Sequence, residues 1–162
     1  MLEEFKQSMK AEFEMTDLGV MKYFLGVEII QGNSGIFMCQ RRYAREILER
    51  FKLESCNAVR NPIVPGAKLI KDDTCKKSDS HLYKQMVGCL MYLAATRPDI
   101  MYVLSLVCRF MENPSDSHMQ AVKRIFRYVK GTMEYGIWYR KDCNRKMIAF
   151  SDSDYAGDVE SR

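Results

Sequence analysis

Residues 82–111 read LYKQMVGCLMYLAATRPDIMYVLSLVCRFM, with two helical patterns on either side of a short polar break. Leu82–Ala95 has the spacing of apolar residues that is typical of a helix. The break, Thr96–Asp99, has the composition of a capping box with a proline tolerated in the first turn, and it predicts a second helix through Met111. Helices joined by so short a link pack antiparallel, so a helical hairpin is expected here.

Two more helices are expected around this hairpin, Arg42–Phe51 before it and Ser117–Lys130 after it. Each has one apolar stripe at helical spacing. The stripes consist of Tyr43, Ile47, Leu48 and Phe51 in the first helix and of Ala121, Val122, Ile125, Phe126 and Val129 in the second. Gly131 then acts as a stop signal. Residues 61–80 are rich in proline, glycine and polar side chains, which predicts a long connecting loop.

The N-terminal part of the chain combines an expected helix with an expected hairpin. Leu2–Phe13 has the pattern of an amphipathic helix. Met21–Ile30 is dense in aromatic and β-branched residues, as a buried strand would be. Asn33–Gly35 supplies turn residues for a return strand over Ile36–Cys39. Gly26 interrupts the first strand, which indicates a bulge or a close approach by another backbone.

The C-terminal part has the pattern of two strands, Tyr135–Tyr139 and Met147–Phe150, separated by a charged turn. The expected fold class is α+β, with a β-hairpin, four or five helices in a bundle, and two C-terminal strands that lack the rest of their sheet. Such strands leave open edges.

Length and composition indicate a single globular domain, because 162 residues with 47% apolar side chains can close a core. The longest uncharged stretches, Met86–Thr96 and Ile100–Cys108, are shorter than the roughly 18 residues of a membrane span. The start of the chain lacks the basic and apolar regions of a secretory signal. We therefore expect no membrane partner and a cytoplasmic or nuclear location.

The six cysteines form no C-x-x-C pair, and two histidines are too few to complete a zinc pattern. They are interpreted as reduced structural thiols. A disulfide framework is the alternative, but a chain of this length with this much helical pattern does not need one.

Positive charge is concentrated in two segments although the net charge is only +4. The first contains Arg41, Arg42, Arg45, Arg50 and Lys52, and the second contains Lys123, Arg124, Arg127, Lys130, Arg140, Lys141, Arg145 and Lys146. The last residues reverse sign, with Asp152, Asp154, Asp158 and Glu160. Clustered cations are typical of a protein that binds phosphates.

Four strings occur in an order that points to one family. They are Tyr23-Phe24-Leu25-Gly26-Val27-Glu28-Ile29, Ala95-Thr96-Arg97-Pro98-Asp99-Ile100, Lys123-Arg124-Ile125-Phe126-Arg127-Tyr128-Val129-Lys130-Gly131-Thr132 and Ser151-Asp152-Ser153-Asp154-Tyr155-Ala156-Gly157-Asp158. Together they resemble the copia-type retrotransposon Pol polyprotein over essentially the whole chain. The resemblance implies the later part of a reverse transcriptase and the start of its ribonuclease H.

This resemblance divides the chain into three expected parts. Residues 1–40 would be the tail of the polymerase palm with a primer-grip hairpin, and residues 41–131 the thumb and connection helices with the loop 61–80. Residues 132–162 would be the truncated start of a ribonuclease H-like domain.

The hairpin residues Phe24, Leu25, Gly26 and Val27 resemble the primer grip, which seats the end of the growing strand. Gly26 suits that role, because a residue without a Cβ lets the backbone approach a sugar-phosphate chain closely. An ordinary core hairpin with a bulge is the alternative.

The family context also gives the basic helices a role on the template-primer duplex. Arg41, Arg42, Arg45 and Arg50 on one helix, and Lys123, Arg127 and Lys130 on the other, are expected to neutralise phosphates without reading sequence. A solvated charged face is the alternative, since Glu46 and Glu49 lie at pairing distance along the first helix.

The resemblance implies Mg²⁺ in the complete parent enzyme and no cofactor in this chain. The family's Tyr-x-Asp-Asp turn is expected upstream of Leu2, and Asp72-Asp73 lies in a polar loop that cannot fix a two-metal geometry. Asp152 aligns with the first metal-binding aspartate of ribonuclease H. Its partner carboxylates are expected beyond Arg162.

The sequence thus predicts a fragment of a copia-type reverse transcriptase that positions the template-primer duplex for RNA-directed DNA synthesis and is inactive alone. The expected partners are an RNA/DNA duplex and the remaining reverse transcriptase and ribonuclease H segments. The alternative is a stand-alone nucleic-acid-binding or interaction module derived from a retrotransposon.

Overall fold

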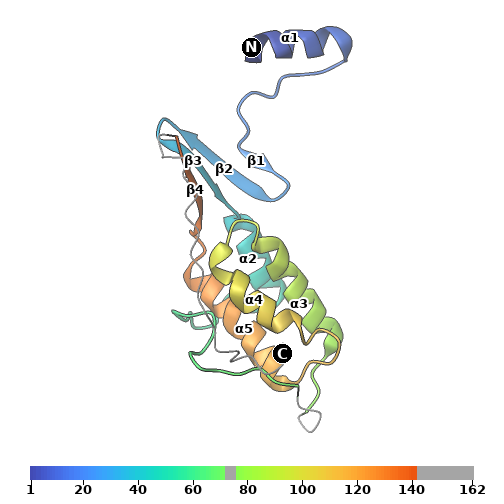
Figure 1. The fold of residues 1–162 in the computed structure, drawn as a ribbon, viewed down its shortest axis with the longest axis vertical. Coiled ribbons are helices and arrows are strands. Elements are labelled where there is room, and N and C mark those ends of the chain that lie inside the picture. Colours follow the sequence, from blue (N-terminus) through green and yellow to red (C-terminus); the bar gives the residue numbers. More distant parts are fainter. Residues whose placement is uncertain (72–75, 142–162) are drawn as a thin grey trace, which may run out of the picture.

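The computed structural model describes residues 1–71 and 76–141, which form three parts arranged in a row (Figure 1). Helix α1 (Leu2–Glu12) lies at one end, a four-stranded sheet lies in the middle, and a bundle of helices lies at the other end. The chain enters the bundle from the sheet and returns to the sheet after the last helix. The expected α+β class is confirmed.

Helix α1 confirms the helix expected over Leu2–Phe13 and ends one residue earlier than expected. Glu3 and Glu4 lie in its first turn, where their charge complements the positive end of the helix dipole. None of its residues is buried, and Phe5 is 61% exposed. The apolar stripe of α1 is therefore left largely open to solvent.

Four antiparallel strands form the sheet in the order β1-β2-β3-β4. Their bounds are Tyr23–Phe24 for β1, Val27–Gly32 for β2, Gly35–Cys39 for β3 and Gly136–Arg140 for β4. Gly32 pairs with Gly35, which leaves a two-residue turn between β2 and β3. The hairpin predicted around Asn33–Gly35 is thus confirmed.

The expectation of a single buried strand over Met21–Ile30 is wrong, because the segment forms two strands and because it is not buried. The chain reverses at Leu25 and Gly26, whose φ angles are +46° and +79°, so this stretch forms the β1-β2 hairpin. Both angles lie in the left-handed region that a type I′ turn requires. Phe24 is 55% exposed because no helix in the described part of the chain packs across the sheet.

Strand β4 corrects the expectation that the C-terminal strands lack the rest of their sheet. Its pairing with β3 runs from Gly136 opposite Cys39 to Arg140 opposite Gly35. The hairpin before the helices and the strand after them therefore belong to one sheet. The second expected strand, at residues 147–150, lies outside the described residues, and the ribonuclease H assignment of residues 132–162 stays a prediction.

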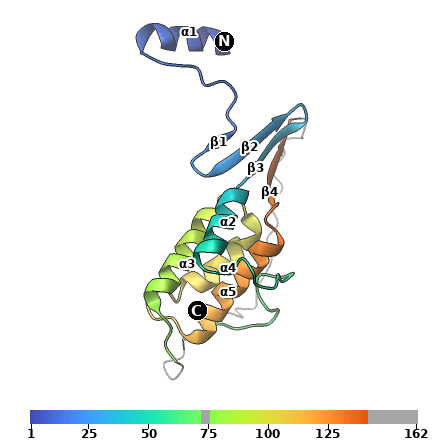
Figure 2. The same ribbon diagram turned by 180° about the vertical axis from the view of Figure 1, so that it is seen from behind.

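The bundle contains α2 (Arg41–Arg50), α3 (Ser80–Leu93), α4 (Met101–Cys108) and α5 (Asp116–Gly131), with a 3-10 turn η1 (Pro98–Ile100) before α4. Helix α5 packs against the other three helices. Figure 2 shows the bundle from behind, with β3 leading into α2 and α5 leading toward β4. The buried core includes Ile47 and Leu48 of α2, Met86, Val87 and Leu90 of α3, Val103 and Val107 of α4, and Val122, Ile125, Phe126 and Val129 of α5. The predicted apolar stripes are thus confirmed.

The capping box of this bundle lies at α5, and the one expected at Thr96–Asp99 is wrong. The backbone N–H of Ser115 donates to Nδ1 of His118 at 3.0 Å, while the Ser115 side chain accepts from the His118 backbone. No side chain caps η1, and Thr96 donates instead to Gln40 at 2.9 Å. The Thr96–Asp99 break therefore serves contacts outside its own helix.

Gly88 lies exposed inside α3, where an added Cβ would meet nothing within 4 Å. Gly88→Ala is expected to raise the free energy of unfolding by about 1 kcal/mol, because alanine loses less backbone entropy in a helix. Urea denaturation measures the change. Gly66→Ala is the matched control, since its φ of +76° penalises a side chain and predicts a loss of stability. A loss of stability in Gly88→Ala would contradict the helical setting.

The described cysteines, Cys39, Cys56, Cys89 and Cys108, are free thiols, as the sequence predicts; Cys75 and Cys143 lie outside the described residues. Within the described ranges, no helix combines the length and the apolar character that crossing a bilayer would take.

Candidate nucleic-acid interface

The β1-β2 turn is attached to helix α3 by one side chain. The Tyr92 hydroxyl donates to the carbonyl oxygen of Leu25, and the Tyr92 ring packs edge-on against Tyr43 of α2 at 4.8 Å between centroids. A Cβ on Gly26 would lie 2.7 Å from the Tyr92 hydroxyl. The bulge or close backbone approach expected at Gly26 is therefore wrong: Gly26 lies in the turn and is approached by a tyrosine side chain, and glycine suits both that approach and the positive φ.

The same turn presents apolar side chains to solvent. Phe24 is 55% exposed and Leu25 is 72% exposed. An exposed leucine held at positive φ is uncommon, since only a few per cent of non-glycine residues adopt such a conformation. The structure thus offers an exposed apolar tip at this turn.

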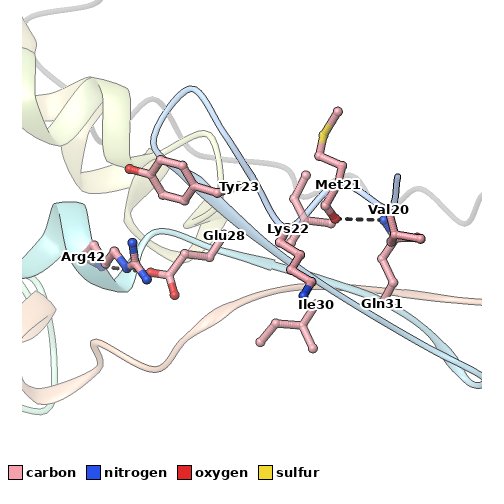
Figure 3. A pocket seen from close by; sticks show the side chains of 9 residues that line it. Val20, Met21, Lys22, Tyr23, Glu28, Ile30, Gln31 and Arg42 are labelled. Atoms are coloured by element: carbon pink, nitrogen blue, oxygen red, sulfur yellow. Dashed lines mark hydrogen bonds between the residues drawn. The ribbon is translucent and has the colours of Figure 1, made fainter. Parts of the chain in front are cut away.

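A groove of about 350 Å³ lies beside the turn, between β2 and the segment that leads into β1. Figure 3 shows Glu28 and Arg42 pointing toward each other at one end, and Gln31 bonded to the Met21 backbone at the other. The Arg42 guanidinium also lies 5.5 Å from the centre of the Tyr23 ring. The remaining lining residues are Val20, Lys22, Ile29 and Ile30. The groove therefore combines cations, a carboxylate, an amide and apolar surface.

Two of the predicted phosphate-binding residues on α2 make contacts within the protein. Arg41 forms ion pairs with Glu28 at 3.3 Å and with Glu134 at 3.0 Å, and so ties α2 to β2 and to the segment before β4. The Arg42 backbone N–H donates to the Glu28 carboxylate at 2.9 Å. Glu28 therefore organises the start of α2.

The other two cations of α2 are exposed. Arg45 is exposed, and Arg50 is exposed and lies 3.9 Å from the Cys89 sulfur. Among the described residues, Glu46 and Glu49 form no ion pair with either arginine. Arg45 is consequently the α2 cation with the least competition from protein contacts.

The cations of α5 hold the connecting segment instead of facing outward together. Arg127 donates to the carbonyl of Asn57 at 2.7 Å, and Lys130 donates to the carbonyl of Glu54. Arg124 adds a bond to the Asn61 carbonyl at 3.2 Å. Lys123 is exposed. The chain after α2 thus covers one face of α5, and of the three predicted α5 cations Lys123 is the exposed one.

Arg97 forms a buried polar cluster that sequence reasoning missed. Its side chain is 2% exposed and makes two parallel bonds to the Asp99 carboxylate, at 2.9 and 2.8 Å. It also donates to the carbonyl oxygen of Thr132 at 2.9 Å and to its hydroxyl at 2.6 Å. The Arg97-x-Asp99 spacing was the available signal, but it was interpreted as part of a cap.

The Asp99 carboxyl has a shifted pKa. Burial raises this pKa, but the hydrogen bonds and charge of Arg97, with a hydrogen bond from Tyr128 at 2.9 Å, outweigh burial. The pKa therefore lies below its ordinary value of 3.8. The carboxylate stays ionised opposite the arginine at neutral pH.

The described ranges 1–71 and 76–141 contain no set of side chains that could bind magnesium. No three His, Cys, Asp or Glu side chains gather there in a way that could hold a metal ion. Asp152, Asp72 and Asp73 lie outside the described residues, so the predicted role of Asp152 stays a prediction.

The predicted site residues fall into three places. Phe24, Leu25, Gly26 and Val27 lie together at the turn, Arg41, Arg42, Arg45 and Arg50 follow on α2, and Lys123, Arg127 and Lys130 lie apart on α5. The turn and α2 are joined through Tyr92 and Tyr43. The primer-grip and phosphate-binding roles of these residues stay predictions.

Residues 1–65 match the protein family described as Reverse transcriptase (RNA-dependent DNA polymerase). That range contains the turn, the groove and α2. Strands β1 to β3 and helix α2 therefore lie within the segment that matches reverse transcriptases.

Curated relatives extend the match over nearly the whole chain. The chain is 37% identical over 153 residues to the Retrovirus-related Pol polyprotein from transposon RE1 of Arabidopsis thaliana, covering 94% of this chain and 10% of that protein. It is 31% identical over 171 residues to the Pol polyprotein from transposon TNT 1-94 of Nicotiana tabacum, covering 100% of this chain and 13% of that protein. The chain belongs to the family of copia-type retrotransposon Pol polyproteins.

A further relative is an uncharacterised mitochondrial protein of Arabidopsis thaliana, 37% identical over 154 residues. The match covers 95% of this chain and 64% of that protein. The chain therefore spans less than two thirds of each of these relatives. No solved structure matches the chain.

Proposed function

We propose that this chain is the part of a copia-type reverse transcriptase that positions the template-primer duplex for RNA-directed DNA synthesis. The observation that carries the proposal is the exposed Leu25-Gly26 turn, fixed on α3 by Tyr92. A tight turn with an apolar tip can lie against sugars, and nearby cations can hold phosphates without reading bases. The family match supports the proposal because it covers the turn and α2.

Within this proposal, the interface runs from the turn along the exposed side of α2. Lys22 and Arg42 line the groove beside the turn, and Arg45 is exposed on α2. Lys123 is a further exposed cation, on α5. We infer that the carboxylates that bind magnesium for synthesis belong to other parts of the parent polyprotein, and we expect the chain alone to extend no primer.

Binding to a labelled RNA/DNA hybrid, followed by fluorescence anisotropy across a salt series, tests the proposal. Affinity is expected to fall steeply with salt. A plot of the logarithm of the association constant against the logarithm of the salt concentration should have a negative slope of about 0.9 per phosphate contact. Arg45→Ala should weaken binding and reduce the slope by about 1. Lys68→Ala is the matched control, because it removes one exposed charge from the loop 61–80. Equal effects of the two variants, or salt-independent binding, would contradict the interface.

A stand-alone nucleic-acid-binding module is the second candidate. The uncharacterised mitochondrial relative favours this candidate, because the match covers 64% of that protein but only 10% of the RE1 polyprotein. A recessed primer end separates the candidates: a positioning segment should prefer a primer-template junction over a blunt hybrid, whereas a general module should bind both alike. Primer extension with magnesium by the purified chain would overturn the proposed inactivity.

A further inference from the structure

The sheet and the bundle are joined by two crossings of the chain, and the link between α3 and η1 contacts both. Gln40 connects β3 to α2, and residues 132–135 connect α5 to β4. The Thr96 hydroxyl donates to the Gln40 side chain at 2.9 Å. Arg97, the next residue, donates to the carbonyl and the hydroxyl of Thr132. Two adjacent buried side chains therefore reach both crossings.

The guanidinium of Arg97 is held in one orientation. Asp99 accepts both of its parallel bonds, and the rings of Tyr128 and Tyr135 lie 5.7 and 5.3 Å from its central carbon. Arginine suits this place because its planar fork can bond a carboxylate twice and stack on aromatic rings. Lysine, a point charge on a flexible stem, cannot reproduce both contacts.

The junction between sheet and bundle depends mainly on polar contacts. In the described part of the chain, the apolar core cluster and the side chains packed on it include no residue of the four strands. Besides Arg97, contacts across the junction include the Arg41 pairs with Glu28 and Glu134, the bond from the Arg42 backbone to Glu28, the approach of Arg42 to the Tyr23 ring and the bond from Tyr92 to Leu25. Arg97 is the most buried cation among them, at 2% exposure. Its bonds are therefore the least accessible to competing water.

We propose that Arg97 is a positioning residue that fixes the orientation of the sheet on the helical bundle. By holding Thr132, it fixes β4, and through the β4-β3-β2 pairing it sets where the Leu25-Gly26 turn lies relative to α2. The coupling follows from the contacts alone. Its consequence for a duplex rests on the proposed function.

Hydrogen exchange of the full chain measures the coupling. Thr132→Val removes the hydroxyl that accepts from Arg97 and donates to the Tyr128 carbonyl at 2.8 Å, and Thr132→Ser keeps it as the matched control. Amides of the β3-β4 ladder are expected to exchange about tenfold faster in Thr132→Val, the size expected for losing one bond to a charged donor. Amides of the α3 and α5 core should keep their protection, and Thr132→Ser should restore the ladder.

Arg97→Lys extends the test by removing the forked bonds while keeping the charge, and it should accelerate the ladder more than Thr132→Val does. Equal acceleration of sheet and core amides would mark ordinary loss of stability and overturn the positioning role. An unchanged ladder in both variants would overturn it as well.

Hybrid binding separates this inference from the proposed function. If both hold, Thr132→Val weakens hybrid binding with an unchanged salt slope, because the phosphate contacts remain but their alignment is lost. If the β3-β4 amides exchange faster in Thr132→Val while the affinity for the hybrid stays unchanged, Arg97 does not position the turn for the duplex. A wild-type chain that binds no hybrid would refute the proposed function, and the exchange experiment would still decide the coupling by Arg97.

Discussion

Gly136→Val is expected to detach β4 from β3. A Cβ at this position would lie 2.9 Å from the Cβ of Cys39 and from the Phe37 ring, and closer still to the Met38 carbonyl oxygen. The closest of these atoms belongs to the backbone of the paired strand, so no side-chain rotation can relieve the clash. The strand must move away as a whole.

The expected loss is local to the sheet. The opening free energy of the β3-β4 amides should fall to near 0, as in fraying segments. The helical core should persist, because the core cluster of the described residues lies outside the strands. Hydrogen exchange measures the opening of the sheet and the protection of the core. The single tryptophan, Trp138 of β4, is also a fluorescence probe, because its ring centroid lies 6.1 Å from that of Phe37 in the wild type.

Gly32→Ala is the matched control for this substitution. It lies in β2 of the same sheet, and an added Cβ there meets nothing within 4 Å. Its exchange pattern should resemble that of the wild type. Protected β3-β4 amides in Gly136→Val would show that this close pairing does not exist in solution.

The helices of the bundle could be predicted because their pattern and their burial have the same cause. A stripe repeating every three or four residues can be buried only as a helix packed on its neighbours. Ile47, Val122 and Phe126 were read in this way and are 2%, 0% and 0% exposed. The boundaries of the other helices also agreed within about two residues, but the helix expected through Met111 ends at Cys108.

The sheet was harder to predict because its decisive features are not local. A Leu-Gly pair lacks the Asn-Gly or Asp-Gly composition that identifies a type I′ turn, so β1 and β2 read as one strand. Their aromatic and β-branched residues indicated burial, although no described helix covers the sheet. The pairing of β4 with β3 joins segments on opposite sides of the whole bundle, and no sequence pattern specifies that partner.

The cations show a different limit of sequence reasoning. Charge and helical spacing identified Arg127 and Lys130, but the acceptors of their bonds are backbone carbonyls at residues 57 and 54. Every residue has such a carbonyl, so composition cannot single these out. Arg41 and Arg97 were likewise counted as a surface charge and a cap residue, while their partners lie on distant elements.

Asp99→Asn is expected to lower the free energy of unfolding by about 1–3 kcal/mol, because the buried Arg97 loses its charged partner while the Asp99 side chain itself is 31% exposed. The substitution leaves the size of the side chain unchanged but takes the negative charge away from Arg97, which is 2% exposed. Thr132 and the tyrosine rings cannot neutralise that charge. Urea denaturation at neutral pH measures the loss, and Asp116→Asn, at the exposed first turn of α5, is the control.

The pH dependence separates the lost ion pair from a packing defect. The folded-state pKa of Asp99 lies below the ordinary value of 3.8, so its contribution is fully present above that value and is lost as the pH falls through the folded-state pKa. The stability difference between wild type and Asp99→Asn should therefore stay constant from neutral pH to about 5 and then shrink in more acid solution. A difference that persists unchanged into acid would mean that Arg97 is held by the shape of its pocket and not by the charge of Asp99. Thr132 would then be its principal anchor, and the orientation of the sheet would not depend on acid.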